Sequence, residues 1–147
     1  MVTIYLDNCG LQRPYDDQSQ VRIQLEAQAI LAVITLFEQQ KIELISSETL
    51  YFEAEQNPHL HRRRYVLRLL DRISHYYETT DVIVHRANQY ESSGLQSFDA
   101  LHLATSVEAK ANYFCSCDDR LLKRAKQLDT GSTRVVSPLE LIEVLEP

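Results

Sequence analysis

Four acidic residues stand at positions where a parallel α/β fold brings carboxylates together. Asp7 directly follows one apolar run of the sequence, and Asp118 directly follows a later one. Glu53 lies on a predicted helix after the second apolar run, and Asp99 lies in the first turn of another predicted helix. Because ligands of such folds bind beyond the carboxyl ends of the strands, we expect one pocket to hold all four acids.

The chemistry of such a cluster is that of a divalent cation. Neighbouring carboxylates repel one another and raise each other's pKa, so a bound cation is the main way to make their clustering favourable. Oxygen ligands suit Mg²⁺ or Mn²⁺, which accept phosphate oxygens of a substrate as further ligands. The pattern therefore predicts metal-dependent hydrolysis of phosphodiester bonds.

Each acid taken singly also has an ordinary structural interpretation. Acids in the first turn of a helix interact favourably with the helix dipole, which would account for Asp99 and Asp118. Asp7 is harder to explain in this way, since an acid that ends an otherwise buried strand needs a partner or a metal. The combination of the four acids, more than any one of them, indicates a functional site.

The elements that must position these acids alternate along the chain. Short apolar runs predict strands at residues 2–6, 42–45, 112–117 and 133–136. Helical periodicity and capping residues predict helices at residues 21–40, 47–57, 59–77, 79–91, 98–111 and 118–128 and from 138 onward, with a short strand possible at the start of 79–91. Ser46 or Ser47 is expected to cap the second helix and Ser97 the fifth.

This alternation predicts an α/β fold, a three-layer α/β/α sandwich with a central, mainly parallel sheet. The chain has 147 residues, the size of one ordinary domain, so we expect a single domain over residues 1–147. Only 3 Gly and 4 Pro occur, which favours helices over a turn-rich sandwich or barrel of strands.

Charge is unevenly distributed. The formal net charge is -6, which does not favour nucleic-acid binding by the chain as a whole. The predicted helix at 59–77 nevertheless carries a run of arginines, of which four are candidate contacts to an RNA backbone or a partner: Arg62, Arg63, Arg64 and Arg68. A solvated helix face explains this run equally well. A second group of basic residues lies near residues 120–126. We favour an ordinary explanation for it, because cations are common near the C-terminus of a helix.

The sequence predicts a cytoplasmic protein. No apolar run approaches the roughly 18 residues that cross a membrane, and the first residues do not resemble a secretion signal. The 3 Cys fit neither a disulfide framework nor a zinc site of paired cysteines.

Four segments in this order resemble a known family. They are Tyr5-Leu6-Asp7, residues 47–53, the run SFDALHLA at 97–104 and the run FCSCDDRLL at 114–122. Together they resemble the PIN domain, the fold of VapC-type toxin ribonucleases, over almost the whole chain. Cys117 departs from the family pattern, whereas Ser116 matches the Ser or Thr that precedes the last acid by two residues.

The resemblance implies a Mg²⁺- or Mn²⁺-dependent ribonuclease that cleaves single-stranded RNA and leaves a 5′ phosphate and a 3′ hydroxyl. By motif position, Asp7, Asp99 and Asp118 would hold metal, and Glu53 would bind metal or orient the water. The family also implies RNA as substrate, a homodimer, and the role of toxin beside a cognate antitoxin protein.

Several alternatives stay open at this stage. Glu48 competes with Glu53, and Asp119 is the substitute for Asp118; five residues apart on a helix, Glu48 and Glu53 point in different directions. Asn8 and Ser116 are candidates to support the acids or to contact phosphate. A catalytically silent fold that binds RNA or an antitoxin is the second functional hypothesis, and a receiver- or phosphatase-like metal-binding domain is the third.

Overall fold

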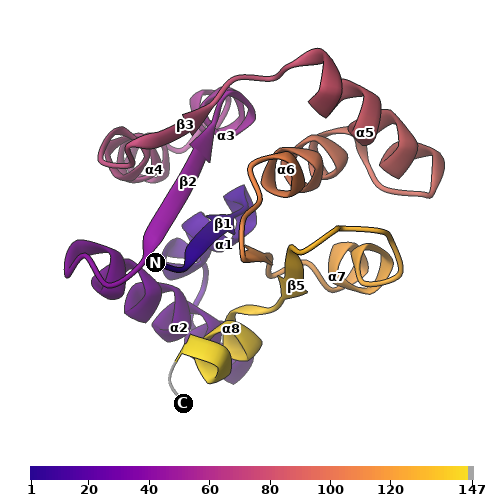
Figure 1. Ribbon diagram of the computed structural model, residues 1–147. Coiled ribbons are helices and arrows are strands. Elements are labelled where there is room, and N and C mark those ends of the chain that lie inside the picture. The colour runs from indigo at the N-terminus through magenta and orange to yellow at the C-terminus, as the bar shows by residue number, and fades with distance from the viewer. Residues whose placement is uncertain (146–147) are drawn as a thin grey trace.

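The computed structural model describes residues 1–145, which form a five-stranded, all-parallel sheet covered by helices (Figure 1). The strands are β1 (Thr3–Leu6), β2 (Glu43–Ser47), β3 (His75–Tyr77), β4 (Tyr113–Cys115) and β5 (Arg134–Val136). Their order across the sheet is β3-β2-β1-β4-β5. The predicted α/β class and parallel sheet are thus confirmed.

Helices occupy the segments between the strands and complete the three layers. They are α1 (Asn8–Gln12), the 3-10 helix η1 (Arg13–Tyr15), α2 (Val21–Glu38), α3 (Glu48–Glu55), α4 (Leu60–Asp71), α5 (Asp81–Ser92), α6 (Ser97–Glu108), α7 (Asp119–Ala125) and α8 (Pro138–Leu145). In Figure 1, α2 and α8 pack together on one side of the sheet, and α6 and α7 lie on the other.

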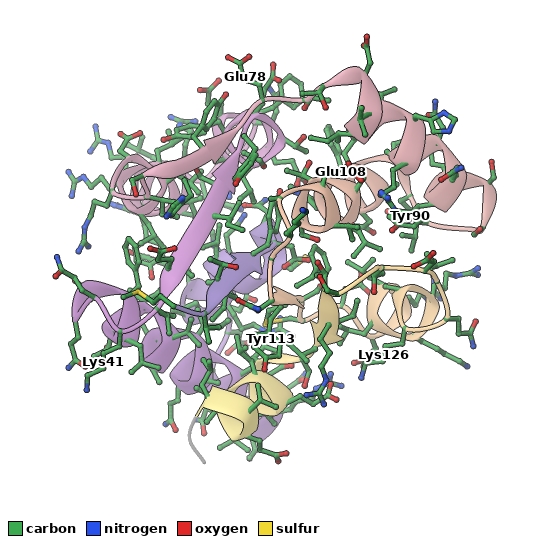
Figure 2. The ribbon with its side chains drawn as sticks, in the orientation of Figure 1. Lys41, Glu78, Tyr90, Glu108, Tyr113 and Lys126 are labelled. Carbon is green, nitrogen blue, oxygen red and sulfur yellow. The ribbon has the colours of Figure 1, made fainter. Side chains whose placement is uncertain are left out.

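The core lies along the central strands. Ile4, Tyr5 and Phe114 are fully buried, because β1 and β4 have helices on both faces and both sets of alternating side chains point into protein. Tyr90 of α5 lies between α5 and α7 (Figure 2), and its hydroxyl donates to the Asp129 carbonyl at 2.6 Å. This contact anchors the loop that follows α7.

The sheet reverses direction between β1 and β4. Chain order runs from β1 through β2 to β3 toward one edge, and then from β4 to β5 toward the other. Such a reversal leaves a crevice at the carboxyl ends of the two central strands, where ligands of parallel sheets bind. Leu6 pairs with Cys115, so the next residues, Asp7 and Ser116, leave the sheet at the same level.

The structure corrects the expected helix over residues 59–77. The helix ends at Asp71, and His75–Tyr77 forms the edge strand β3. All three residues of β3 are exposed, so no buried alternation marks them as a strand. Their conformation comes from pairing with Ile45–Ser47 of β2, which is a contact between distant segments. The short strand expected near residue 79 is absent from this part of the chain.

Two local features also differ from the sequence analysis. Residues 8–10, for which the sequence predicted neither a helix nor a strand, belong to α1, and the Asp7 side chain caps that helix. Ser97 was expected to cap the helix before Asp99, but its hydroxyl donates to Glu91 at 2.6 Å, and Gln96 takes the cap position without a side-chain bond. Ser47 does cap α3, where its hydroxyl oxygen accepts from the Leu50 amide at 3.1 Å.

Candidate functional site

Asp7 is the most buried acid at the crevice. It follows β1, is 2% exposed, and its Oδ1 accepts a hydrogen bond from the Gly10 amide at 2.8 Å. Burial raises the pKa of this carboxyl to about 6, although hydrogen bonds from Ser116 and Gly10 oppose the shift. The nearby Asp99 charge raises the pKa further. Ionisation of the Asp7 carboxyl group is therefore unfavourable in the folded protein.

Asp118 reaches the same crevice from the end of β4. Its Oδ1 caps α7 by accepting from the Arg120 amide at 2.9 Å and the Leu121 amide at 3.3 Å. Within residues 1–145 its Oδ2 has no hydrogen bond. The buried Ser116 hydroxyl accepts from the Asp118 amide at 3.0 Å, and so links the turn after β4 to the acids. Asp118 thus has a structural role and one free oxygen.

Asp119 points elsewhere. Its two oxygens accept from the Arg22 guanidinium of α2 at 2.5 and 2.7 Å, and its side chain is 67% exposed. This ion pair holds the pKa of Asp119 below its usual value. The geometry therefore favours Asp118 over Asp119 as the acid of the crevice.

Asp99, in the first turn of α6, lines a small pocket of about 160 Å³ together with Asp118. Its pKa is raised, first by burial and then by the charges of Asp118 and Glu53. The charges of Asp118 and Glu53 therefore act on Asp99, so these three acids lie within electrostatic range of one another.

Glu53 is held by a chain of buried side chains. Its Oε1 lies against His102 Nε2, and the His102 Nδ1 lies 2.6 Å from the Tyr5 hydroxyl. The Tyr5 hydroxyl in turn lies 2.7 Å from the Ser47 hydroxyl. Tyr5 and His102 are 0% and 1% exposed, so this network is shielded from water. It joins β1, the end of β2, α3 and α6.

The network has one proton arrangement that satisfies every member. The Ser47 hydroxyl oxygen accepts from the Leu50 amide, so its proton is free to be donated to the Tyr5 hydroxyl. Tyr5 can then donate its own proton to His102 Nδ1. His102 in turn carries a proton on Nε2, which it donates to the Glu53 carboxylate. The reverse direction would leave the buried Ser47 proton without an acceptor. Glu53 is therefore oriented by a donor, and its Oε2 has no hydrogen-bond partner among residues 1–145.

The sequence did not single out this network. His102 appeared in the sequence analysis only within the run at residues 97–104, and Tyr5 only within the segment Tyr5-Leu6-Asp7. The usable signal was the three-residue spacing of Asp99 and His102, which places both on one side of α6. Tyr5 and Ser47 carried no signal, because they are 42 residues apart and meet only through the pairing of β1 with β2.

Glu48 is directed away from this network. Its Oε1 accepts from the Thr79 amide at 2.9 Å, which ties the start of α3 to the loop before α5. Glu53, on the opposite side of α3, contacts His102 instead. The geometry thus favours Glu53 of the two candidate acids.

Asn8 and Ser116 both lie beside Asp7. Asn8 is partly buried, and its Oδ1 is a buried acceptor without a hydrogen-bond partner among residues 1–145. Such an acceptor is available to a ligand or water. Ser116 is fully buried and bonds to the Asp118 amide, so its contacts are with the acids rather than with solvent.

The four arginines predicted to contact RNA divide into two pairs. Arg62 bonds to Asp16 and to the Tyr15 carbonyl, both at 2.7 Å, and Arg63 bonds to the Asn57 carbonyl at 3.0 Å. Arg64 and Arg68 line a pocket of about 440 Å³ between α2 and α4, whose other lining residues are Tyr15, Leu31, Ile34, Glu38, His61, Tyr65, Leu69 and Arg72. None of the candidate acids lines that pocket.

The donor set fits a hard divalent ion by its chemistry, since it consists of carboxylates that repel one another and one unpartnered amide oxygen. Within residues 1–145, however, no three His, Cys, Asp or Glu side chains are gathered so that they could hold a metal ion as they stand. An ion would therefore have to draw the side chains of Asp7, Asp99 and Asp118 closer together.

The fold and this crevice define the class: an α/β protein with an acid-lined site at the switch point of a parallel sheet. No family profile and no curated protein matches the chain. Among solved structures, 12 chains match. One of them comes from the crystal structure of VapBC2 from Rickettsia felis bound to a DNA fragment from its promoter.

That match covers 92% of this chain and 98% of the other, with a TM-score of 0.58 and 9% sequence identity. It shows that the two chains share a fold. In addition, none of the helices in residues 1–145 is long and apolar enough to cross a membrane.

Proposed function

We propose that this protein is a Mg²⁺- or Mn²⁺-dependent endoribonuclease with a PIN-like fold that hydrolyses single-stranded RNA. The observation that supports the proposal is that Asp99 and Asp118 line one pocket beyond the central strands, with the charge of Asp99 acting on the buried Asp7. The resemblance of the surrounding motifs to PIN domains supports the same assignment.

Asp7, Asp99 and Asp118 would hold the ion. When bound, it would lower the pKa of a water and offset negative charge on the leaving 3′ oxygen. Glu53 would accept a hydrogen bond from the attacking water through Oε2, while His102 keeps its other oxygen in place. In the reaction the water oxygen bonds to phosphorus, the bond from phosphorus to the 3′ oxygen breaks, and that oxygen takes a proton.

The activity is tested by incubating single-stranded RNA with the purified protein in Mn²⁺, in Mg²⁺ and in chelator. We expect cleavage with either ion and none with chelator. In the Asp99→Asn variant, which keeps the shape of the side chain and removes its charge, cleavage should fall to the level seen with chelator. Cleavage that survives chelation, or that Asp99→Asn leaves intact, would contradict the proposal.

The two glutamates of α3 provide a matched pair of variants. Glu53→Gln should reduce the rate of RNA cleavage by roughly 10- to 100-fold, because the amide oxygen still accepts from His102 but the charge beside the water is lost. Glu48→Gln should leave the rate unchanged, since its amide oxygen still accepts from the Thr79 amide. Single-turnover cleavage rates measure both. Equal losses would refute the assignment of Glu53.

A catalytically silent module that binds RNA or an antitoxin is the second candidate function. It is favoured by one observation, the lack of a gathered three-ligand group among residues 1–145. The cleavage experiment separates the two candidates: a silent module would bind RNA or a partner protein, but would leave every RNA intact with either ion.

We also propose that the protein is the toxin of a toxin–antitoxin pair. The shared fold with a chain of a VapBC2 complex supports this proposal. The pocket between α2 and α4 suits a partner segment, because its lining combines the apolar side chains of Leu31 and Ile34 with the basic side chains of Arg64 and Arg68. A homodimer and a cytoplasmic location stay predictions from the sequence.

A further inference from the structure

Two arginines of α7 share a pocket with the candidate catalytic acids. The pocket of about 160 Å³ lies between the start of α6 and α7, and Arg120 and Arg124 line it together with Asp99 and Asp118. Its remaining lining residues are Gly94, Leu95, Gln96 and Leu121. The volume is below the roughly 300 to 1,000 Å³ of sites that enclose whole small molecules, so it suits one charged group of a larger ligand.

Arg124 is positioned over the backbone at Gly94. A Cβ built on Gly94 would lie only 2.3 Å from Arg124 Nη1, so the guanidinium occupies space that a side chain at this position would take. Gly94 also has a φ of 109°, which favours glycine for a second reason. The absence of a side chain at residue 94 thus leaves room for the guanidinium at this pocket.

Neither Arg120 nor Arg124 has an ion pair or a side-chain hydrogen bond with any residue in 1–145. Some arginines elsewhere in the described residues are paired, such as Arg62 with Asp16, Arg72 with Glu38 and Arg86 with Glu108. The two guanidiniums of the pocket therefore keep their hydrogen-bond donors free for a ligand, although two carboxylates line the same small space.

We propose that Arg120 and Arg124 bind a backbone phosphate of the RNA strand next to the phosphate that is cleaved. This inference rests on the proposed function. An acid-lined crevice repels a polyanion, and guanidiniums bind phosphate with two parallel hydrogen bonds, so the pair supplies the attraction that the acids lack. From the sequence, arginines of α4 are candidate contacts to RNA or a partner, with a solvated face as an equal explanation, but the pocket of Arg64 and Arg68 contains no candidate catalytic acid.

Binding of a fluorescent single-stranded RNA to the Asp99→Asn protein tests this assignment without cleavage, by anisotropy at several salt concentrations. Adding Arg120→Ala or Arg124→Ala should weaken binding by about tenfold and should reduce the slope of log K against log salt by about 0.7 for each lost phosphate contact. Arg124→Lys should keep the slope but not the full affinity, because an ammonium ion cannot bind in the bidentate geometry.

Arg134→Ala is the matched control, since it removes one exposed arginine from β5, outside the pocket. Arg134→Ala should change neither the affinity for RNA nor the salt slope. In the otherwise unaltered enzyme, Arg124→Ala should raise KM for RNA by about tenfold and leave kcat within about twofold, as expected for a contact made equally in the ground state and the transition state.

The outcomes are distinguishable. Suppose that the wild-type protein cleaves RNA, but that the affinity for RNA, the salt slope and KM change only in the double variant Arg64→Ala and Arg68→Ala. The phosphate site then lies on α4. This inference is overturned, while the proposed function stands. If the wild-type protein neither cleaves nor binds RNA, the proposed function fails and the inference fails with it.

Discussion

Asp7→Asn should stabilise the metal-free protein at pH 8 by about 3 kcal/mol. The Asp7 carboxyl has a pKa of about 6 in the folded protein, against the ordinary value of 3.8 for an aspartate, and each unit of that pKa difference corresponds to about 1.4 kcal/mol. Between these two pKa values the folded protein binds more protons than the unfolded chain, so stability falls as pH rises. Above pH 6 the full cost of the buried charge is present.

Asparagine removes this cost without removing the helix cap. Its side-chain oxygen still accepts from the Gly10 amide, and asparagine is as good a cap as aspartate. The stabilisation should therefore be large at pH 8 and nearly absent at pH 4, where the wild-type carboxyl is already protonated. Chemical denaturation at the two pH values measures it.

Asp17→Asn is a suitable control, because exposed Asp17 also caps a local turn by accepting from the Ser19 amide at 2.9 Å. It should shift stability by less than about 0.5 kcal/mol at either pH. Mn²⁺ should raise the melting temperature of the wild-type protein more than that of Asp7→Asn. A variant that is less stable than the wild type at pH 8 would show that the Asp7 charge is already compensated within the fold.

The second large effect is expected from His102→Ala, which should lower the free energy of unfolding by about 3 to 5 kcal/mol. His102 is 1% exposed and packs against the ring of Tyr5, with ring centroids 5.6 Å apart. Its removal creates a cavity and leaves the fully buried Tyr5 hydroxyl without its acceptor. Because His102 also orients Glu53, cleavage of RNA should fall as well.

Tyr5→Phe separates the two costs of that change. It removes the hydroxyl while the ring remains, so its cost should be about 1 to 3 kcal/mol, from the partners Ser47 and His102 that lose their bond. His85→Ala, an exposed histidine of α5, should cost less than about 1 kcal/mol. Urea denaturation compares all three. If His102→Ala cost no more than His85→Ala, the buried network would not contribute to stability.

The strands and helices that carry strong local patterns were predictable. β1, β2 and β4 are apolar because helices cover both faces of the sheet, and α2 shows helical periodicity over 18 residues. β3 was missed because all three of its residues are exposed, so only hydrogen bonding to β2 makes it a strand. α1 was missed because its five residues are nucleated by one cap, that of Asp7.

Sequence order alone placed Asp7 at a strand end, Asp118 at the start of a helix and Asp99 in a first helical turn, since these are local properties of the chain. Which acid of a neighbouring pair faces the crevice depends on distant partners: Arg22 draws Asp119 toward α2, and Thr79 draws Glu48 away. The arginines that line a pocket with Asp99 and Asp118 are those of α7, and the residues that hold Glu53 come from elements up to 97 residues apart. Contacts of this kind exist only once the sheet has assembled, because strand order, and not proximity in sequence, brings their members together.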